Sequence, residues 1–149
     1  MLKIREATPD DAELLYNLYN NHLIKNPPKE TQNMQEWKEK ISKFSANPLY
    51  HLLVGEVENS VVSSVTIVIV ENLTHNQRPY ALIENVVTHK NFRGKQYATA
   101  LMHKAEELAK SLNCYKIMLL TGAKEAKTLY FYENCGYNSN DKTAFIKWL

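Results

Sequence analysis

The sequence predicts an α/β protein with a mixed, mostly antiparallel central sheet flanked by helices. Two amphipathic helical segments come first, and three strand segments rich in branched apolar residues follow them. Beyond these strands a helical pattern alternates with short strand patterns. Strands joined by tight turns pair antiparallel, whereas a strand–helix–strand unit forms a right-handed parallel crossover. No linker, repeat or low-complexity tract divides the 149 residues, so we expect residues 1–149 to form a single domain.

Caps and apolar spacing predict the first two helices. The segment Thr8–Asp11 has a capping side chain, a proline at the first helical position and acids in the first turn. The helix that begins there runs to about Leu23, and Pro27 and Pro28 break it. A second helix begins after Thr31. Its apolar stripe contains Met34, Trp37, Ile41 and Phe44.

Three strands form the centre of the predicted sheet. Tyr50–Val57 and Val61–Val70 are rich in branched and aromatic residues and are joined by a turn at Asn59–Ser60. The third strand, Tyr80–Thr88, follows the polar loop Asn72–Pro79. Because short connections join them, we expect these strands to pair antiparallel.

The second half of the chain alternates helix and strand. A helix runs from Gly94 to about Leu112, followed by a short buried strand, Tyr115–Leu120. A final helix, Lys124–Cys135, ends at Gly136, which we expect to be a left-handed cap. A last strand, Thr143–Leu149, is expected to close the chain.

The composition excludes several classes of protein. A net charge of +2 without a dense block of Lys and Arg argues against a nucleic-acid partner. The longest apolar run, near Ile67–Val70, is too short to span a bilayer, and the N-terminal MLKIREATPD lacks the apolar core of a signal peptide. Cys114 and Cys135 are isolated, without the spacing of a metal site or a disulfide framework. We therefore expect a cytoplasmic protein with no metal, nucleic-acid or membrane partner.

The segment Phe92–Leu101 (FRGKQYATAL) is the strongest functional signal. It follows the strand Tyr80–Thr88 and leads directly into a helix. The first N–H groups of a helix have no internal acceptor and carry the positive end of the helix dipole, which favours a ligand that bears a pyrophosphate. The four glycines of the chain are too scattered to form a Walker loop or a GxGxxG fingerprint. The ligand must therefore use a different loop geometry.

Two motifs resemble those of the GNAT superfamily of acyl-CoA-dependent N-acetyltransferases. The loop Arg93–Ala98 (RGKQYA) is similar to that family's Arg/Gln-x-x-Gly-x-Gly/Ala, and Phe131–Tyr137 (FYENCGY) is similar to its late Phe-Tyr-Glu-x-x-Gly-Phe/Tyr. The similarity extends from about Val61 to Tyr137, and the order of the elements fits. The central loop glycine is Gln96 here, and a positive φ at that position would strain it. The resemblance implies the GNAT fold and acetyl-CoA as co-substrate.

The resemblance implies a cofactor site at the end of a strand and the start of the next helix. Backbone N–H groups from Gly94 to Thr99 would hold the pyrophosphate, with added charge from Arg93 and Lys95. Main-chain groups of Val86–Thr88 would meet the pantetheine amides, as an added strand does. The alternative for the two cations is that they are solvated loop residues. The expected cofactor-binding residues are Val86, Val87, Thr88, Arg93, Gly94, Lys95, Gln96, Tyr97, Ala98 and Thr99.

Two side chains are candidates for the base and acid of acetyl transfer. An alkylamine has a pKa of ~10.4, so a base or a desolvated site must help at neutral pH. Glu84, in an apolar strand two residues before Val86 and hence on the same face, is the candidate base; a structural ion pair or a more open face is the alternative. The resemblance places Tyr132 as the acid near the thioester sulfur, with core packing, or Tyr130 in its place, as alternatives. No residue resembles a covalent nucleophile, so we expect direct attack in a ternary complex.

The acceptor amine is less visible in the sequence. Ile83–Arg93 and Cys114–Ile117 (CYKI) are most similar to glucosamine-phosphate N-acetyltransferases, which favours a small amine such as an amino sugar. In this family the first two helices and loops such as Asn72–Pro79 build the acceptor pocket. Arg78 is a candidate for an anionic substrate group or an ordinary surface arginine. A protein or peptide N-acetyltransferase and a non-catalytic acyl-CoA-binding domain are the alternatives. Related enzymes often form homodimers through sheet edges or late strands, so we expect a homodimer.

Overall fold

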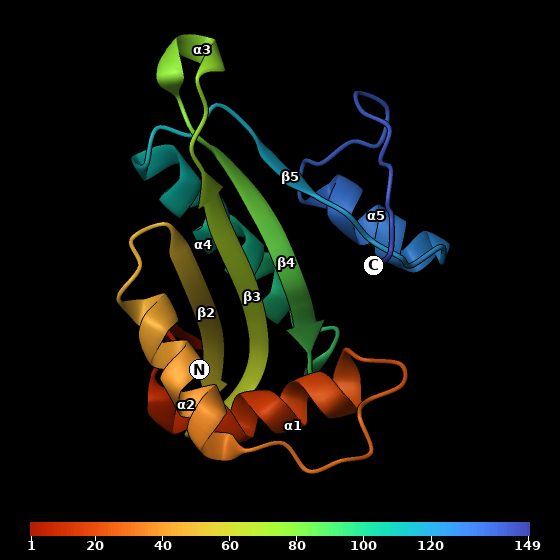
Figure 1. The fold of residues 1–149 in the computed structure, drawn as a ribbon. Helices are drawn as coiled ribbons and strands as arrows, with labels where there is room; N and C mark the ends of the chain where they lie inside the picture. The colour runs from red at the N-terminus through yellow and green to blue at the C-terminus, as the bar shows by residue number, and fades with distance from the viewer.

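The computed structural model describes residues 1–149, which form one five-stranded sheet in the order β1-β2-β3-β4-β5 (Figure 1). Strands β1 to β4 pair antiparallel in chain order, and β5 pairs parallel to β4. The mixed, mostly antiparallel sheet predicted from the sequence is therefore confirmed. The strands are β1 (Lys3–Glu6), β2 (Tyr50–Val57), β3 (Ser60–Val70), β4 (Tyr80–Thr88) and β5 (Ile117–Leu119).

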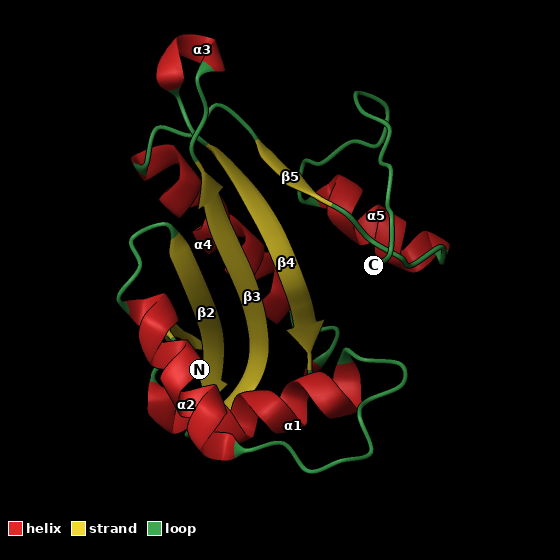
Figure 2. Cartoon of the chain, viewed as in Figure 1, coloured by secondary structure: helices red, strands yellow, loops and turns green.

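Helices cover both faces of this sheet. Figure 2 shows α1 and α2 on one face, α4 on the other, and α5 beyond β5. None of the helices has the length and apolarity needed to span a membrane. The helical elements are η1 (Pro9–Asp11), α1 (Ala12–His22), α2 (Met34–Ser45), α3 (Thr74–Gln77), η2 (Lys90–Phe92), α4 (Tyr97–Ser111) and α5 (Ala126–Asn134), of which η1 and η2 are 3-10 turns.

The alternation of side chains along the strands divides the core between the two faces. Leu53 packs toward α4 together with Ile67 and Ile83, while its neighbours Leu52 and Val54 pack toward α1 and α2. The central strands are therefore buried on both faces, which explains why they read in the sequence as continuous apolar runs.

Two strands differ from the prediction. β1 is absent from it, because this edge strand has only four residues, of which Ile4 alone is apolar, too few to give a clear strand pattern. Conversely, the expected strand Thr143–Leu149 is wrong, since the segment has no regular structure. A strand needs a neighbour for its N–H and C=O groups, and none of the backbone groups of this segment bonds to another part of the chain. The apolar side chains in it, Phe145 among them, remain exposed.

Arg5 joins β1 to the start of the first helix. Its guanidinium donates to both carboxylate oxygens of Asp11, at 2.7 and 2.8 Å, and to Glu56 of β2 at 2.7 Å. Asp11 also accepts from the backbone N–H of Thr8 at 2.8 Å, at the predicted helix start. Burial raises the pKa of Asp11, but the bonds from Arg5 and Thr8 lower it by more, so its pKa lies below the ordinary value.

Replacing Asp11 with Asn should lower the free energy of unfolding by about 2 kcal/mol, because the half-buried Arg5 loses one of its two charged partners. Urea unfolding at pH 7 measures this loss. The depressed pKa of Asp11 makes the stabilisation present above the unfolded value of about 3.9 and lost as pH falls through the folded value, so the two proteins should converge in acid. Asp10→Asn, an exposed carboxylate in the same turn, is the control. Equal losses in the two variants would contradict the prediction.

Candidate functional site

β4 and β5 separate soon after they pair. Their parallel pairing ends at Ile83 and Leu119, yet β4 continues to Thr88 (Figure 1). From Glu84 onward, this edge of β4 presents backbone N–H and C=O groups with no partner strand. An edge of this kind pairs readily with an extended ligand. The residues predicted to bind pantetheine, Val86 to Thr88, lie along it.

A β-bulge at Asn85 sets the direction of the side chains near this opening. Asn85 has a φ of 54°, and the register with β3 shifts here, so that Asn85 and Val86 together oppose Val65. Glu84 pairs with Thr66 and faces α1 and α2, whereas Val86 packs toward α4. The expectation that Glu84 and Val86 share a face is therefore wrong, because a bulge interrupts the alternation of the strand.

Glu84 lies in more open surroundings than the apolar strand indicates. Its side chain is exposed, and no lysine, arginine or histidine pairs with it, which removes the structural ion pair as an explanation. Burial is the main cause that raises the pKa of Tyr50 and of Tyr132, and the charge of Glu84 adds to both shifts. The carboxylate thus lies within electrostatic reach of two phenols from different elements.

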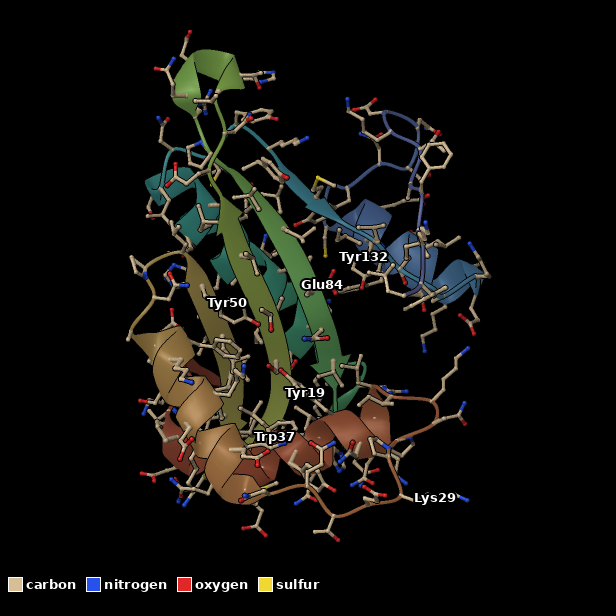
Figure 3. All side chains as sticks on the ribbon, in the orientation of Figure 1. Tyr19, Lys29, Trp37, Tyr50, Glu84 and Tyr132 are labelled. Carbon is tan, nitrogen blue, oxygen red and sulfur yellow. The ribbon has the colours of Figure 1, made fainter.

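Tyr132 belongs to α5 and lies across the opening from Glu84 (Figure 3). α5 ends in a Schellman motif, in which the N–H of Tyr137 donates to the Tyr132 carbonyl at 3.1 Å and that of Gly136 to the Glu133 carbonyl at 2.9 Å. Gly136 has a φ of 88°, so the predicted left-handed cap is confirmed. Because burial raises the pKa of Tyr132, the phenol is protonated at neutral pH and can donate a proton.

The loop before α4 presents a row of free backbone donors. None of the N–H groups from Gly94 to Thr99 donates to a backbone carbonyl, and the first such bond of the helix runs from Ala100 to Gln96 at 2.9 Å. Gly94 and Gln96 have φ angles of 77° and 63°, so Gln96 adopts the strained conformation that the sequence raised as a concern. The 15 residues of α4 add the positive end of their dipole. This set of donors fits a pyrophosphate.

Arg93 and Lys95 lie on this loop in different surroundings. The Nε atom of Arg93 donates to the Thr88 carbonyl at 3.1 Å and so ties the loop to the end of β4. The Nζ atom of Lys95 lies 5.0 Å from the centre of the Phe92 ring, and its side chain is exposed. Arg93 therefore has a structural role beside any role toward a ligand.

A pocket of about 350 Å³ lies between α1, α2 and the face of the sheet toward which Glu84 points. Figure 3 shows three of its aromatic side chains, with Tyr19 and Trp37 below Glu84 and Tyr50 to the left. The first two helices thus form a pocket, as predicted, but most of its residues are missing from the prediction. Trp37 and Phe44 occur there only as a helical packing stripe, and Tyr19 and Tyr50 resemble ordinary core aromatics.

Arg78, the candidate for an anionic substrate group, lies away from the opening. Arg78 precedes β4, at the opposite end from the loop, and donates to the carbonyls of Asn113 and Cys114 at 3.1 and 3.0 Å. These bonds indicate a structural arginine. His89, in contrast, lies close to the loop, and its ring centre is 4.1 Å from that of His22 at the end of α1.

The comparison with known families decides the affiliation of the chain. Residues 12–137 match the model of the Acetyltransferase (GNAT) family. This chain belongs to the GNAT acetyltransferase family. A curated relative from Drosophila melanogaster, named a probable glucosamine 6-phosphate N-acetyltransferase, is 30% identical over 118 residues, which cover 74% of this chain and 52% of the relative. The chain thus spans about half the length of the curated relatives it matches first.

Solved structures agree with the GNAT fold. A protein of Agrobacterium tumefaciens str. C58, provisionally named an acetyltransferase, is 36% identical with a TM-score of 0.86, covering 98% of this chain and 99% of that chain. A Clostridium acetobutylicum protein described with acetyl-CoA is 22% identical with a TM-score of 0.77, covering 99% and 96%, which shows the shared fold. The fold that the two sequence motifs predict is therefore confirmed.

Replacing Gln96 with Gly should raise the free energy of unfolding of this GNAT domain by about 0.5–1 kcal/mol, because glycine adopts a left-handed φ without crowding a Cβ. Urea unfolding without ligand measures the change. Lys95→Gly is the matched control, since Lys95 has no positive φ and glycine there only adds freedom to the unfolded chain. A higher free energy of unfolding in Lys95→Gly, or a lower one in Gln96→Gly, would contradict the strain at Gln96.

Proposed function

We propose that this GNAT protein transfers the acetyl group of acetyl-CoA to the primary amine of a small molecule by direct attack in a ternary complex. One observation carries the proposal: free backbone donors, a carboxylate and a protonated phenol surround the opening between β4 and β5, beside an aromatic pocket. Family membership and the structural neighbour described with acetyl-CoA support this co-substrate.

Acetyl-CoA would bind along the edge of β4 and over the start of α4. The N–H groups from Gly94 to Thr99 donate to the pyrophosphate, and Lys95 adds a positive charge. The main-chain groups of Val86 to Thr88 bond to the amides of the pantetheine arm. Arg93 holds the loop at the end of β4 and so keeps the donors in place.

Glu84 and Tyr132 would manage the two proton transfers. The carboxylate of Glu84 takes a proton from the ammonium form of the acceptor, directly or through a water. The amine nitrogen then attacks the thioester carbon, and the C–S bond breaks as the C–N bond is completed. The hydroxyl of Tyr132 donates its proton to the leaving thiolate, for which its raised pKa keeps it in the protonated form. The second proton that the nitrogen loses as it becomes an amide restores the phenol.

The shape of the site favours a small molecule over a protein acceptor. A pocket of about 350 Å³ bounded by two helices suits a compact amine, whereas a peptide chain needs an open groove. The curated relatives are named for glucosamine 6-phosphate, which belongs to this class of acceptor.

Release of free thiol from acetyl-CoA tests the proposal against a panel of amino sugars, alkyl and aryl amines, polyamines, amino acids and lysine peptides. Turnover with small amines is expected. Turnover with peptides alone would overturn the small-molecule assignment. Binding of acetyl-CoA without any release would favour a binding domain, and the absence of binding would refute the site itself.

Glu84→Gln and Tyr132→Phe should each lower kcat on the order of 100-fold, because each removes a proton-transfer group. On the alkaline side, the kcat of the unmodified protein should fall only beyond the usual tyrosine range, because the pKa of the Tyr132 phenol is raised, and Tyr132→Phe should remove that decline. Tyr130→Phe, which removes an exposed hydroxyl from the same helix, is the control and should leave kcat unchanged. A loss in Tyr130→Phe with none in Tyr132→Phe would reassign the acid.

We also propose that the protein is a homodimer. The segment Thr143–Leu149 has the composition of a strand but no partner in its own chain, and it exposes Phe145, Ile146 and Trp148. β5 pairs on one edge only. An unpaired strand pattern and a free strand edge together favour pairing between two copies.

Phe145→Asp combined with Trp148→Asp should convert the dimer to a monomer, because charges replace the apolar contact between copies. Sedimentation velocity at micromolar concentration measures the association state. Leu73→Asp, at an exposed apolar residue far from this segment in the chain, is the control and should remain dimeric. A monomeric unmodified protein would refute the dimer.

A further inference from the structure

The pocket between α1 and α2 has apolar walls in fixed positions. Phe44 stacks on Tyr50 with ring centroids 3.9 Å apart. The ring centroids of Trp37 and Tyr19 lie 6.2 Å apart. The indole N–H of Trp37 donates to the Oε1 atom of Gln32 at 2.6 Å. Gln32 is outside the lining of the pocket, so the polar edge of the indole is engaged elsewhere and the ring system forms the wall.

The hydroxyl of Tyr19, on the sheet side of the pocket, already has a hydrogen-bond partner in Ser64. Ser64 donates to the Leu53 carbonyl at 3.1 Å, so the hydroxyl of Tyr19, 3.2 Å from Ser64, must donate to it. Burial raises the pKa of Tyr19 and of Tyr50, and the Thr66 hydroxyl, which contacts both phenols, partly offsets this. The polar groups left for a ligand are mainly the side chains of Glu36, Lys40 and Asn85. The many hydroxyls of a buried sugar ring need more partners than these.

The charges around the pocket suit a cation rather than a phosphate. Lys40 is the only cation in the lining, and Glu36, one helical turn earlier on α2, balances it. Glu84 adds a negative charge close to Tyr50. Proteins bind phosphate groups with arginine forks, several cations or a helix N-terminus, and this lining has none of these.

We infer that the acceptor is a primary amine carried on an aryl or arylalkyl group, of the size of 2-phenylethylamine, and not a phosphorylated amino sugar. The inference rests on the proposed function, since it names the substrate class of that same site. The aromatic walls hold the ring of the acceptor, while its ammonium group extends toward Glu84. A cavity of about 350 Å³ has room for one such ring and its short chain.

The acceptor preference is tested by comparing kcat/KM for 2-phenylethylamine, ethylamine and glucosamine 6-phosphate, with acetyl-CoA saturating. Ethylamine reaches Glu84 without filling the pocket and serves as the minimal amine. We expect kcat/KM for 2-phenylethylamine to exceed that for ethylamine by about 30-fold or more, because burying the phenyl ring contributes to binding. Glucosamine 6-phosphate should be no better than ethylamine.

Variants of the pocket identify the residues responsible. Trp37→Ala should lower kcat/KM for 2-phenylethylamine about 10-fold, mainly through KM, and should lower kcat/KM for ethylamine by a smaller factor, because ethylamine does not fill the pocket. Trp37→Phe should keep most of the preference, and thermal unfolding of both variants checks that they are folded. Titration calorimetry with 2-phenylethylamine reports binding even where no turnover occurs.

The outcomes separate the inference from the proposed function. A preference for 2-phenylethylamine that depends on Trp37 supports both. A preference for glucosamine 6-phosphate that Lys40→Ala weakens overturns the inference and leaves the N-acetyltransferase standing. Preference for the aryl amine without any effect of Trp37→Ala overturns the pocket assignment. Without turnover of any amine the proposed function fails, and calorimetry then decides whether the pocket binds aryl amines at all.

Discussion

The early end of pairing between β4 and β5 is the constraint on which the site depends. Parallel hydrogen bonds stop at Ile83 and Leu119, and the bulge at Asn85 then turns the rest of β4. One strand thereby serves two purposes. Its free edge offers main-chain groups to a ligand, while one of its faces directs Glu84 toward the space beside α1 and α2. Continued pairing to Thr88 would close this space and leave the loop before α4 without a ligand path.

The positive potential at the loop before α4 comes more from backbone groups than from charged side chains. The donors from Gly94 to Thr99 are main-chain groups at the positive end of α4, so an anion can be held although the whole chain carries a net charge of only +2. The negative charge of Glu84 lies at the opening, where it favours a cation, while burial, with a smaller contribution from Glu84, keeps the phenol of Tyr132 protonated. In the proposed reaction, opposite potentials would thus draw the two substrates to separate places.

The sequence predicts those parts of the fold that depend on neighbouring residues. The cap at Gly136 and the donor loop are local patterns, so both are confirmed as structure. The bulge at Asn85 depends on the register with another strand, and for this reason the face of Glu84 is predicted wrongly. The segment Thr143–Leu149 shows the same limit, because a strand pattern does not contain its partner. The pocket is also non-local, since its rings come from α1, α2 and β2 and each resembles a core residue by itself.

Helix α1 contacts both the aromatic pocket and the region beside the donor loop before α4. Tyr19 on this helix lines the aromatic pocket, and His22 at its end lies against His89, just before the donor loop. A rigid helix cannot shift for one ligand without moving the wall of the other, so variation in α1 alters both affinities together. Helix α2 supplies Trp37 and Phe44 and lies away from the loop (Figure 1). Substitutions in α2 can therefore change the aromatic pocket while the donor loop before α4 is preserved.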